Sequence, residues 1–107
     1  IERCAAALAE VPQIVAVGVN CCAPHHVEGL LGRLRDATDR ILVAYPNAGE
    51  RYASGQWCGR RRSAAEFVAL AERWLAAGAR ILGGCCRTTP AHIAALHRWR
   101  ASLPPAT

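Results

Sequence analysis

The chain contains neither methionine nor lysine, and only six of its 107 residues are aromatic. No apolar run approaches the roughly 18 residues that a membrane-spanning helix needs. The first residues also lack the basic segment and long apolar stretch of a secretory signal peptide. We therefore expect a cytoplasmic protein with one modest core. The missing methionine leads us to expect a piece of a longer reading frame.

Basic charge is supplied by arginine alone. The sequence has thirteen arginines and eight acidic residues, which gives a formal net charge of +5. Positive charge can indicate nucleic-acid binding. However, the one dense basic run is Arg60-Arg61-Arg62, and the other arginines are spread along helical faces without interleaved aromatic residues. The pattern favours a solvated surface, and we expect neither nucleic acid nor membrane as a partner.

Three short apolar runs, each followed by a turn and a helical pattern, organise the chain. They span residues 14–19, 41–45 and 80–84. Continuous apolar runs of this length are typical of parallel strands that are covered on both faces. Because strands and helices alternate, the sequence predicts an α/β fold with parallel strands and helices on the outside.

The helices are predicted from apolar spacing and from their start signals. Ser63 and Glu66 have the spacing of a capping box. Thr89-Pro90 offers an N-cap followed by a first-turn proline, which opens the last helix. Apolar spacing further predicts that Cys4 is buried in the first helix and that Ile93 faces inward in the last one.

Most of the chemistry lies in six cysteines, which are Cys4, Cys21, Cys22, Cys58, Cys85 and Cys86. Four of them form two adjacent pairs, and in a cytoplasmic protein such clustering favours metal binding or reactive thiols. A disulfide between neighbours is disfavoured, because adjacent α-carbons lie about 3.8 Å apart, below the usual bridging range. Cys85 and Cys86 can serve one site only where the strand is no longer regular. Gly83 and Gly84 would supply the unusual backbone angles.

A zinc site at Cys85 and Cys86 needs at least a third ligand. Cys21 is the best candidate, because it follows the first apolar run and would reach the same rim of a parallel sheet. Cys22 is its rival for this position. A structural zinc module closed by Cys21, Cys22, Cys85 and Cys86 remains an alternative, and a redox fragment with free thiols is a third.

The second apolar run ends in Pro46-Asn47-Ala48-Gly49-Glu50, and a long loop then runs to residue 62. Loops of this length are usually functional or disordered. The aromatic faces of Tyr52 and Trp57 could hold a cation, although packing within the loop would also explain them. Asn47 and Glu50 could orient a substrate, but an Asn-Ala-Gly turn also forms without any function.

Together, three strand ends resemble the homocysteine S-methyltransferase family. They read Gly18-Val19-Asn20-Cys21, Tyr45-Pro46-Asn47-Ala48-Gly49-Glu50 and Gly83-Gly84-Cys85-Cys86-Arg87-Thr88-Thr89-Pro90. The resemblance runs through nearly the whole chain, with the motifs in the family's order. It implies that residues 1–107 are the C-terminal portion of a (β/α)8 TIM barrel, from strand six to strand eight. It also implies a catalytic zinc ion bound by Cys21, Cys85 and Cys86.

The activity implied by the resemblance is transfer of a methyl group to the thiol of homocysteine, giving methionine. Three thiolates leave a fourth zinc position free, which a substrate thiol can occupy. The loop after residue 45 looks like that of the branch whose donor is S-methylmethionine or S-adenosylmethionine. Asn47 and Glu50 would then contact substrate, and Tyr52 and Trp57 the donor. We expect the isolated piece to be neither stably folded nor active.

Overall fold

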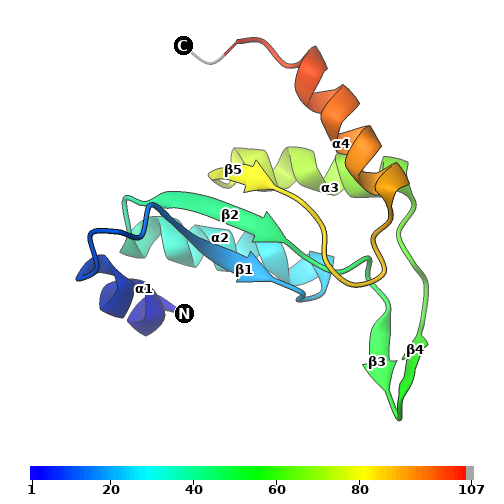
Figure 1. The fold of residues 1–107 in the computed structure, drawn as a ribbon, viewed down its shortest axis with the longest axis horizontal. Coiled ribbons are helices and arrows are strands. Elements are labelled where there is room, and N and C mark those ends of the chain that lie inside the picture. The colour runs from blue at the N-terminus through cyan, green and yellow to red at the C-terminus, as the bar shows by residue number, and fades with distance from the viewer. Residues whose placement is uncertain (106–107) are drawn as a thin grey trace.

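In the computed structural model, which describes residues 1–105, three parallel strands form the central sheet. They are β1 (Ala16–Asn20), β2 (Ile41–Tyr45) and β5 (Ala79–Leu82), in the order β1-β2-β5 (Figure 1). Both neighbouring pairs are parallel, with a register irregularity in the β2–β5 pair. The predicted alternation of parallel strands and helices is confirmed.

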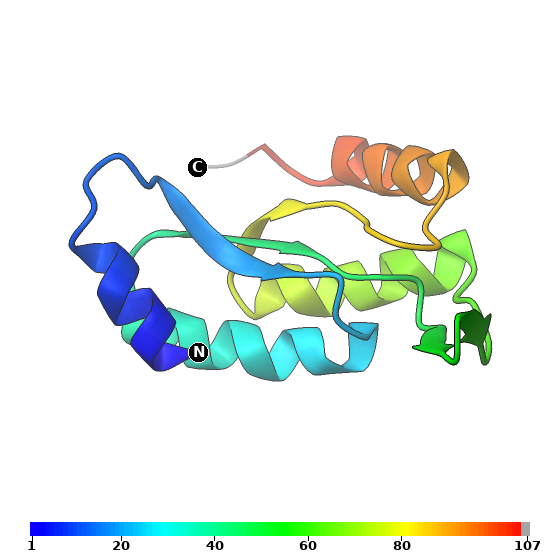
Figure 2. The ribbon, with the colours of Figure 1, turned by 60° about the horizontal axis from the view of Figure 1, so that its bottom comes forward.

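The four helices lie around this sheet. α2 (Pro24–Ala37) and α3 (Ala64–Ala76) run along the same face of the sheet (Figure 2). α1 (Glu2–Ala9) packs against α2, and α4 (Pro90–Ser102) packs against α3. Both crossovers between neighbouring strands therefore pass over one side of the sheet. Within residues 1–105, no helix has the length and apolar character needed to cross a membrane.

The hydrophobic core fills the space between the sheet and the two helices α2 and α3. Phe67 and Trp74 are fully buried there and meet edge to face, with ring centroids 5.3 Å apart. Burying a large apolar side chain contributes about 1.5–3 kcal/mol. The other buried members of the core cluster are Ala5, Val17, Val27, Leu31, Leu34, Leu42, Ala44, Ala71, Ala79 and Leu96.

The face of the sheet opposite α2 and α3 keeps much of its apolar surface exposed. Side chains alternate between the two faces of a strand, and in β2 Leu42 and Ala44 are buried against the helices. On the same strand Ile41 remains 48% exposed and Tyr45 40%, and Ile81 in β5 remains 49% exposed. The prediction that both faces are covered is therefore wrong for residues 1–105, because both crossover helices lie on one side.

Residues 51–58, predicted as part of a long loop, form a β-hairpin. β3 (Arg51–Ala53) and β4 (Gln56–Cys58) pair antiparallel. Ser54 and Gly55 between them have φ values of 52° and 78°, and positive φ at both central residues defines a type I′ hairpin turn. The hairpin projects beyond the carboxyl ends of the central strands (Figure 1). The Ser-Gly dipeptide is the local turn signal for this structure.

The predicted helix starts are confirmed. Ser63 Oγ accepts a hydrogen bond from Glu66 N at 3.1 Å, and Glu66 Oε1 accepts one from Ser63 N at 3.1 Å. α4 has Thr89 as its N-cap and Pro90 in its first turn. In place of a capping glutamate, His92 Nδ1 accepts from Thr89 N at 3.1 Å.

Two burial predictions are wrong, and both errors concern how a helix is turned about its axis. Cys4 is exposed, because α1 directs Ala5 toward the core. Ile93 is 46% exposed, because α4 directs His92 and Leu96 inward. His92 and Leu96 stand four residues apart, so they share one face of α4, while Ile93 lies beside that face.

Candidate metal centre

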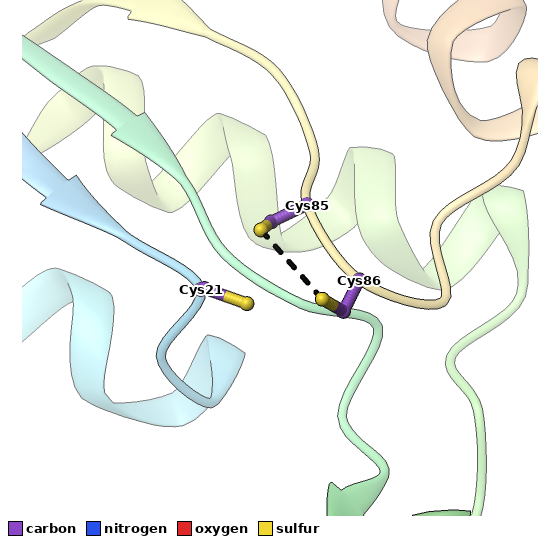
Figure 3. Close-up of side chains that lie close together, drawn as sticks. All are labelled: Cys21, Cys85 and Cys86. Atoms are coloured by element: carbon purple, nitrogen blue, oxygen red, sulfur yellow. Dashed lines mark hydrogen bonds between the residues drawn. The ribbon is translucent and has the colours of Figure 1, made fainter.

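Three cysteines from two separate loops meet at the carboxyl end of the sheet (Figure 3). The sulfur atoms of Cys21, Cys85 and Cys86 all lie within 4.8 Å of one another. Cys21 follows β1 directly, whereas Cys85 and Cys86 lie in the loop after β5. The Cys85 and Cys86 sulfurs are 4.0 Å apart, and all six cysteines are free thiols. The structure thus brings together the three residues that the resemblance implied as metal ligands.

Main-chain hydrogen bonds beyond the strand ends hold the two cysteine loops to the end of β2. Cys21 N donates to Tyr45 O at 3.1 Å, and Cys85 N donates to Pro46 O at 2.9 Å. Ala48 N donates in turn to Cys86 O at 3.1 Å. Because β2 lies between β1 and β5, these bonds continue the pairing of the sheet into the loops and fix where the cysteines stand.

Unusual backbone angles occur at the cysteine loops, but not at the predicted positions. Cys21 has φ 52° and Arg87 has φ 68°, a left-handed conformation that is uncommon for residues other than glycine. Gly83 and Gly84, predicted to supply such angles, have no φ in that region. Residues held in rare conformations are concentrated at functional sites, where the surrounding structure imposes them.

Gly84 is needed for close packing rather than for backbone freedom. A Cβ at this position would lie 2.4 Å from Thr88 Oγ1, which is well inside contact distance. Thr88 Oγ1 itself donates to Cys85 O at 2.6 Å, and Thr88 N donates to the same oxygen at 3.1 Å. The small residue therefore lets Thr88 fold back over the cysteine loop and fix its shape.

The three thiols fit a zinc ion by chemistry and by spacing. Thiolate is a preferred zinc ligand, and a tetrahedral ion with bonds of about 2.3 Å places its sulfurs about 3.8 Å apart. The observed separations, 4.0 Å for one pair and at most 4.8 Å for the others, require only small side-chain shifts. Among residues 1–105, Cys22 is outside this group. The geometry therefore does not support a four-cysteine site.

The thiols influence each other's protonation. The Cys85 thiol and the backbone N–H of Cys86 hydrogen-bond to the Cys21 sulfur, and this lowers the pKa of Cys21. The same contact with Cys21, together with burial, raises the pKa of Cys85 to about 11. Burial raises the pKa of Cys22. Since metal ligands must be deprotonated, binding of a metal ion would displace the Cys85 proton.

Glu50 connects the region beside the hairpin to the second cysteine loop. Its Oε1 accepts from Arg61 Nε and from Arg87 Nε, both at 3.0 Å. The side chain is only 10% exposed, and the hydrogen bonds from Arg61 and Arg87 lower the pKa of this carboxyl group. Arg87 directly follows Cys86, so this carboxylate is tied to the second cysteine loop through the Arg87 side chain.

Tyr52 and Trp57 lie on the hairpin rather than in the loops that carry the cysteines. They are cross-strand partners of β3 and β4, with ring centroids 5.3 Å apart in an edge-on arrangement. Tyr52 is 62% exposed. Their aromatic rings thus lie on the hairpin that projects beyond the central sheet.

Sequence analysis missed His92 as a structural support of the site. Its Nε2 donates to Arg62 O at 2.8 Å, while its Nδ1 accepts from Thr89 N, so a neutral ring with hydrogen on Nε2 meets both contacts. His92 is 4% exposed. The signal was the spacing of Thr89 and His92, which matches a capping box with histidine in place of glutamate.

Parallel strands that alternate with helices define an α/β protein. The cluster of three thiols at the carboxyl end of its sheet is a site suited to a metal ion. The sequence matches the model of the homocysteine S-methyltransferase family over residues 1–99. The chain therefore belongs to the homocysteine S-methyltransferase family.

Two curated relatives and one solved structure illustrate the similarity. A homocysteine S-methyltransferase of Escherichia coli is 47% identical over 93 residues, covering 85% of this chain and 30% of the relative. A selenocysteine Se-methyltransferase of Brassica oleracea var. italica is 41% identical over 101 residues, covering 92% and 29%. The metallated form of the Escherichia coli homocysteine methyltransferase MmuM superposes with a TM-score of 0.72 at 39% identity, covering 92% and 28%. This chain thus spans about three tenths of the length of these relatives.

Proposed function

We propose that the chain is the C-terminal portion of an enzyme that transfers a methyl group from a sulfonium donor to the thiol of homocysteine. The observation that carries the proposal is the group formed by Cys21, Cys85 and Cys86, with sulfurs within 4.8 Å, in a chain of this family. The products would be methionine and the demethylated donor. The donor would be S-methylmethionine or S-adenosylmethionine.

The same proposal places residues 1–107 in a (β/α)8 barrel, located in the cytoplasm, as its last three strand-helix units. A barrel of this kind usually has about 250 residues. Preceding strands would pair with the outer edges of β1 and β5 and cover the apolar sheet face that includes Ile41 and Ile81. The chain spans only 29–30% of the curated relatives, a share that a part of such a barrel would have.

Zinc is the metal that best suits this donor set, and Cys21, Cys85 and Cys86 would hold it. When bound, it would keep the substrate thiol deprotonated and reactive at neutral pH. The chain itself supplies the alignment, because hydrogen bonds to the end of β2 fix both cysteine loops before substrate arrives. Such preorganisation lowers the entropic cost of bringing the reacting groups together.

The transfer balances without an acid from the protein. A carbon–sulfur bond forms between the methyl group and the homocysteine sulfur, whose proton is released. The methyl–sulfonium bond breaks, and its electron pair stays on the donor sulfur. The donor therefore leaves as a neutral thioether, and no general acid is needed to protonate it.

Four further residues are proposed to bind the substrates. Glu50 would accept the ammonium group of homocysteine, since its carboxyl group has a lowered pKa and is tied by Arg87 to the second cysteine loop. Tyr52 and Trp57 would hold the sulfonium cation against their aromatic faces. Asn47 could add a contact through the second hydrogen of its side-chain amide, since one of the two is donated to Cys21 O.

The proposal is tested with the full-length protein that contains these 107 residues, loaded with zinc. We expect methionine to form from homocysteine with one of the two sulfonium donors, as measured by mass spectrometry with a labelled methyl group. Selenocysteine serves as a second acceptor in the same assay, because one relative is named for it. Absence of label transfer to homocysteine with both donors would contradict the proposal.

A further inference from the structure

Within residues 1–105, the turn after β2 contacts both cysteine loops through its main chain. On one side, Asn47 N donates to Cys22 O at 3.0 Å. On the other side, Pro46 O accepts from Cys85 N, and Ala48 N donates to Cys86 O. The residues from Pro46 to Ala48 are buried. The two loops, 64 residues apart in sequence between Cys21 and Cys85, are therefore joined through three consecutive residues.

The side chain of Asn47 adds a second connection to the first loop. Its Nδ2 donates to Cys21 O at 3.2 Å, and its Oδ1 accepts from Gly49 N at 2.8 Å. Asn47 is 8% exposed, and Gly49 has φ 102°. The amide thus closes the turn on itself and, at the same time, fixes the carbonyl of the residue that carries the first sulfur.

The turn after β2 is also anchored to α4, through Arg62. Arg62 N donates to Ala48 O at 2.7 Å, and Arg62 O accepts from the buried ring of His92 at 2.8 Å. The turn therefore cannot shift without breaking contacts to both Arg62 and the second cysteine loop. A residue that binds Cys21 to this turn therefore holds Cys21 against a segment that is itself fixed by other hydrogen bonds.

We propose that Asn47 is a positioning residue that sets the Cys21 sulfur against those of Cys85 and Cys86 through its amide bond to Cys21 O. This inference rests on the proposed function, in which the three sulfurs bind one metal ion. Cys21 has the strained φ of 52°, so its loop needs an outside restraint to stay in place. Loss of residues that orient metal ligands typically lowers metal affinity about 10- to 100-fold.

Two substitutions remove the amide donor and keep the turn. In Asn47→Asp the carboxylate still accepts from Gly49 N, and in Asn47→Ser the hydroxyl can accept from the same group. The aspartate carboxylate has no hydrogen to donate to Cys21 O, and the serine hydroxyl is one bond shorter than the amide that reaches this oxygen. Gln13→Glu is the matched control, because it makes the same amide-to-carboxylate change at an exposed position before β1.

Two readouts are taken on the full-length protein. Zinc affinity is measured by competition with a chromophoric chelator, and we expect both Asn47 variants to bind about 10- to 100-fold more weakly than wild type and Gln13→Glu. In the metal-free protein, a short bifunctional reagent such as dibromobimane is used to link Cys21 to Cys85 or Cys86. We expect this link to form several-fold more slowly in both Asn47 variants.

The outcomes separate this inference from the proposed function. If wild type binds no zinc but the Asn47 variants still link more slowly, the proposed function fails and the positioning role stands. If both variants keep wild-type zinc affinity and linking rate, the positioning role is overturned. A raised KM for homocysteine at unchanged zinc affinity and linking rate would leave Asn47 with its substrate contact alone and would overturn the positioning role. Unfolding of both variants would also count against positioning, because the effect would then be on global stability.

Discussion

Replacing Cys85 by serine is expected to lower zinc affinity about 100- to 1,000-fold and to abolish methyl transfer by the full-length protein. Structural zinc sites bind with about 10–16 kcal/mol, which over four ligands is about 2.5–4 kcal/mol each, or about 100- to 1,000-fold in affinity. A serine hydroxyl neither ionises readily nor matches zinc's preference for sulfur. Among the three thiols, that of Cys85 contacts both others: it hydrogen-bonds to the Cys21 sulfur, and its sulfur stands 4.0 Å from the Cys86 sulfur. Zinc content and turnover are measured on the same preparation.

Two matched cysteine variants make this result specific. Cys58→Ser changes an exposed thiol on the hairpin, and Cys22→Ser changes the neighbour of Cys21. Both should keep wild-type zinc content, because neither sulfur belongs to the three-cysteine group found among residues 1–105. Equal zinc loss in Cys22→Ser and Cys85→Ser would restore the four-cysteine alternative. Full activity in Cys85→Ser would remove the catalytic proposal.

The second large effect is expected at Gly18, where β1 passes close to β2. A Cβ on Gly18 would lie 1.7 Å from Val43 O. Val43 O is a main-chain atom, so it cannot move aside as the end of a flexible side chain could. Gly18→Ala would push the two strands apart, and we expect a cost of about 3 kcal/mol, the upper end of the usual range for overpacking, because the clash is with the main chain. Because Cys21 follows three residues later, zinc affinity should fall as well. Urea denaturation and chelator competition measure the two effects.

Gly29→Ala is the control for this prediction. Gly29 lies in α2, and a Cβ there would meet nothing within 4 Å. Alanine is the better helix former, so this variant should be about 0.5–1 kcal/mol more stable than wild type. Similar stabilities for Gly18→Ala and Gly29→Ala would show that the close approach of β1 and β2 is not a real constraint.

Local sequence patterns predicted the elements and the meeting of the cysteines. Apolar runs of strand length located the three central strands, and the spacing of Ser63 and Glu66 marked the start of α3. The approach of Cys21 to Cys85 followed from one physical rule, that parallel strands present their carboxyl ends to the same edge. No contact between particular side chains had to be known for this prediction.

Features that depend on packing between distant segments were not predictable in this way. The burial of Ala5 instead of Cys4 depends on how α1 is turned against α2, which spacing within one helix does not decide. The left-handed angle occurs at Cys21 rather than at Gly83, because two hydrogen bonds impose it from outside: Cys21 N donates to Tyr45 O, and the Asn47 amide donates to Cys21 O. The contact of Asn47 with Cys21 likewise spans 26 residues and has no local signal.

X-ray absorption at the zinc edge of the metal-loaded, full-length protein tests the central claim most directly. The account predicts three sulfur ligands at about 2.3 Å and one lighter atom before substrate is added. With homocysteine the count should become four sulfurs, and the Cys58→Ser protein should behave identically. Four sulfurs before substrate, or fewer than three, would contradict a site formed by Cys21, Cys85 and Cys86 with one open position.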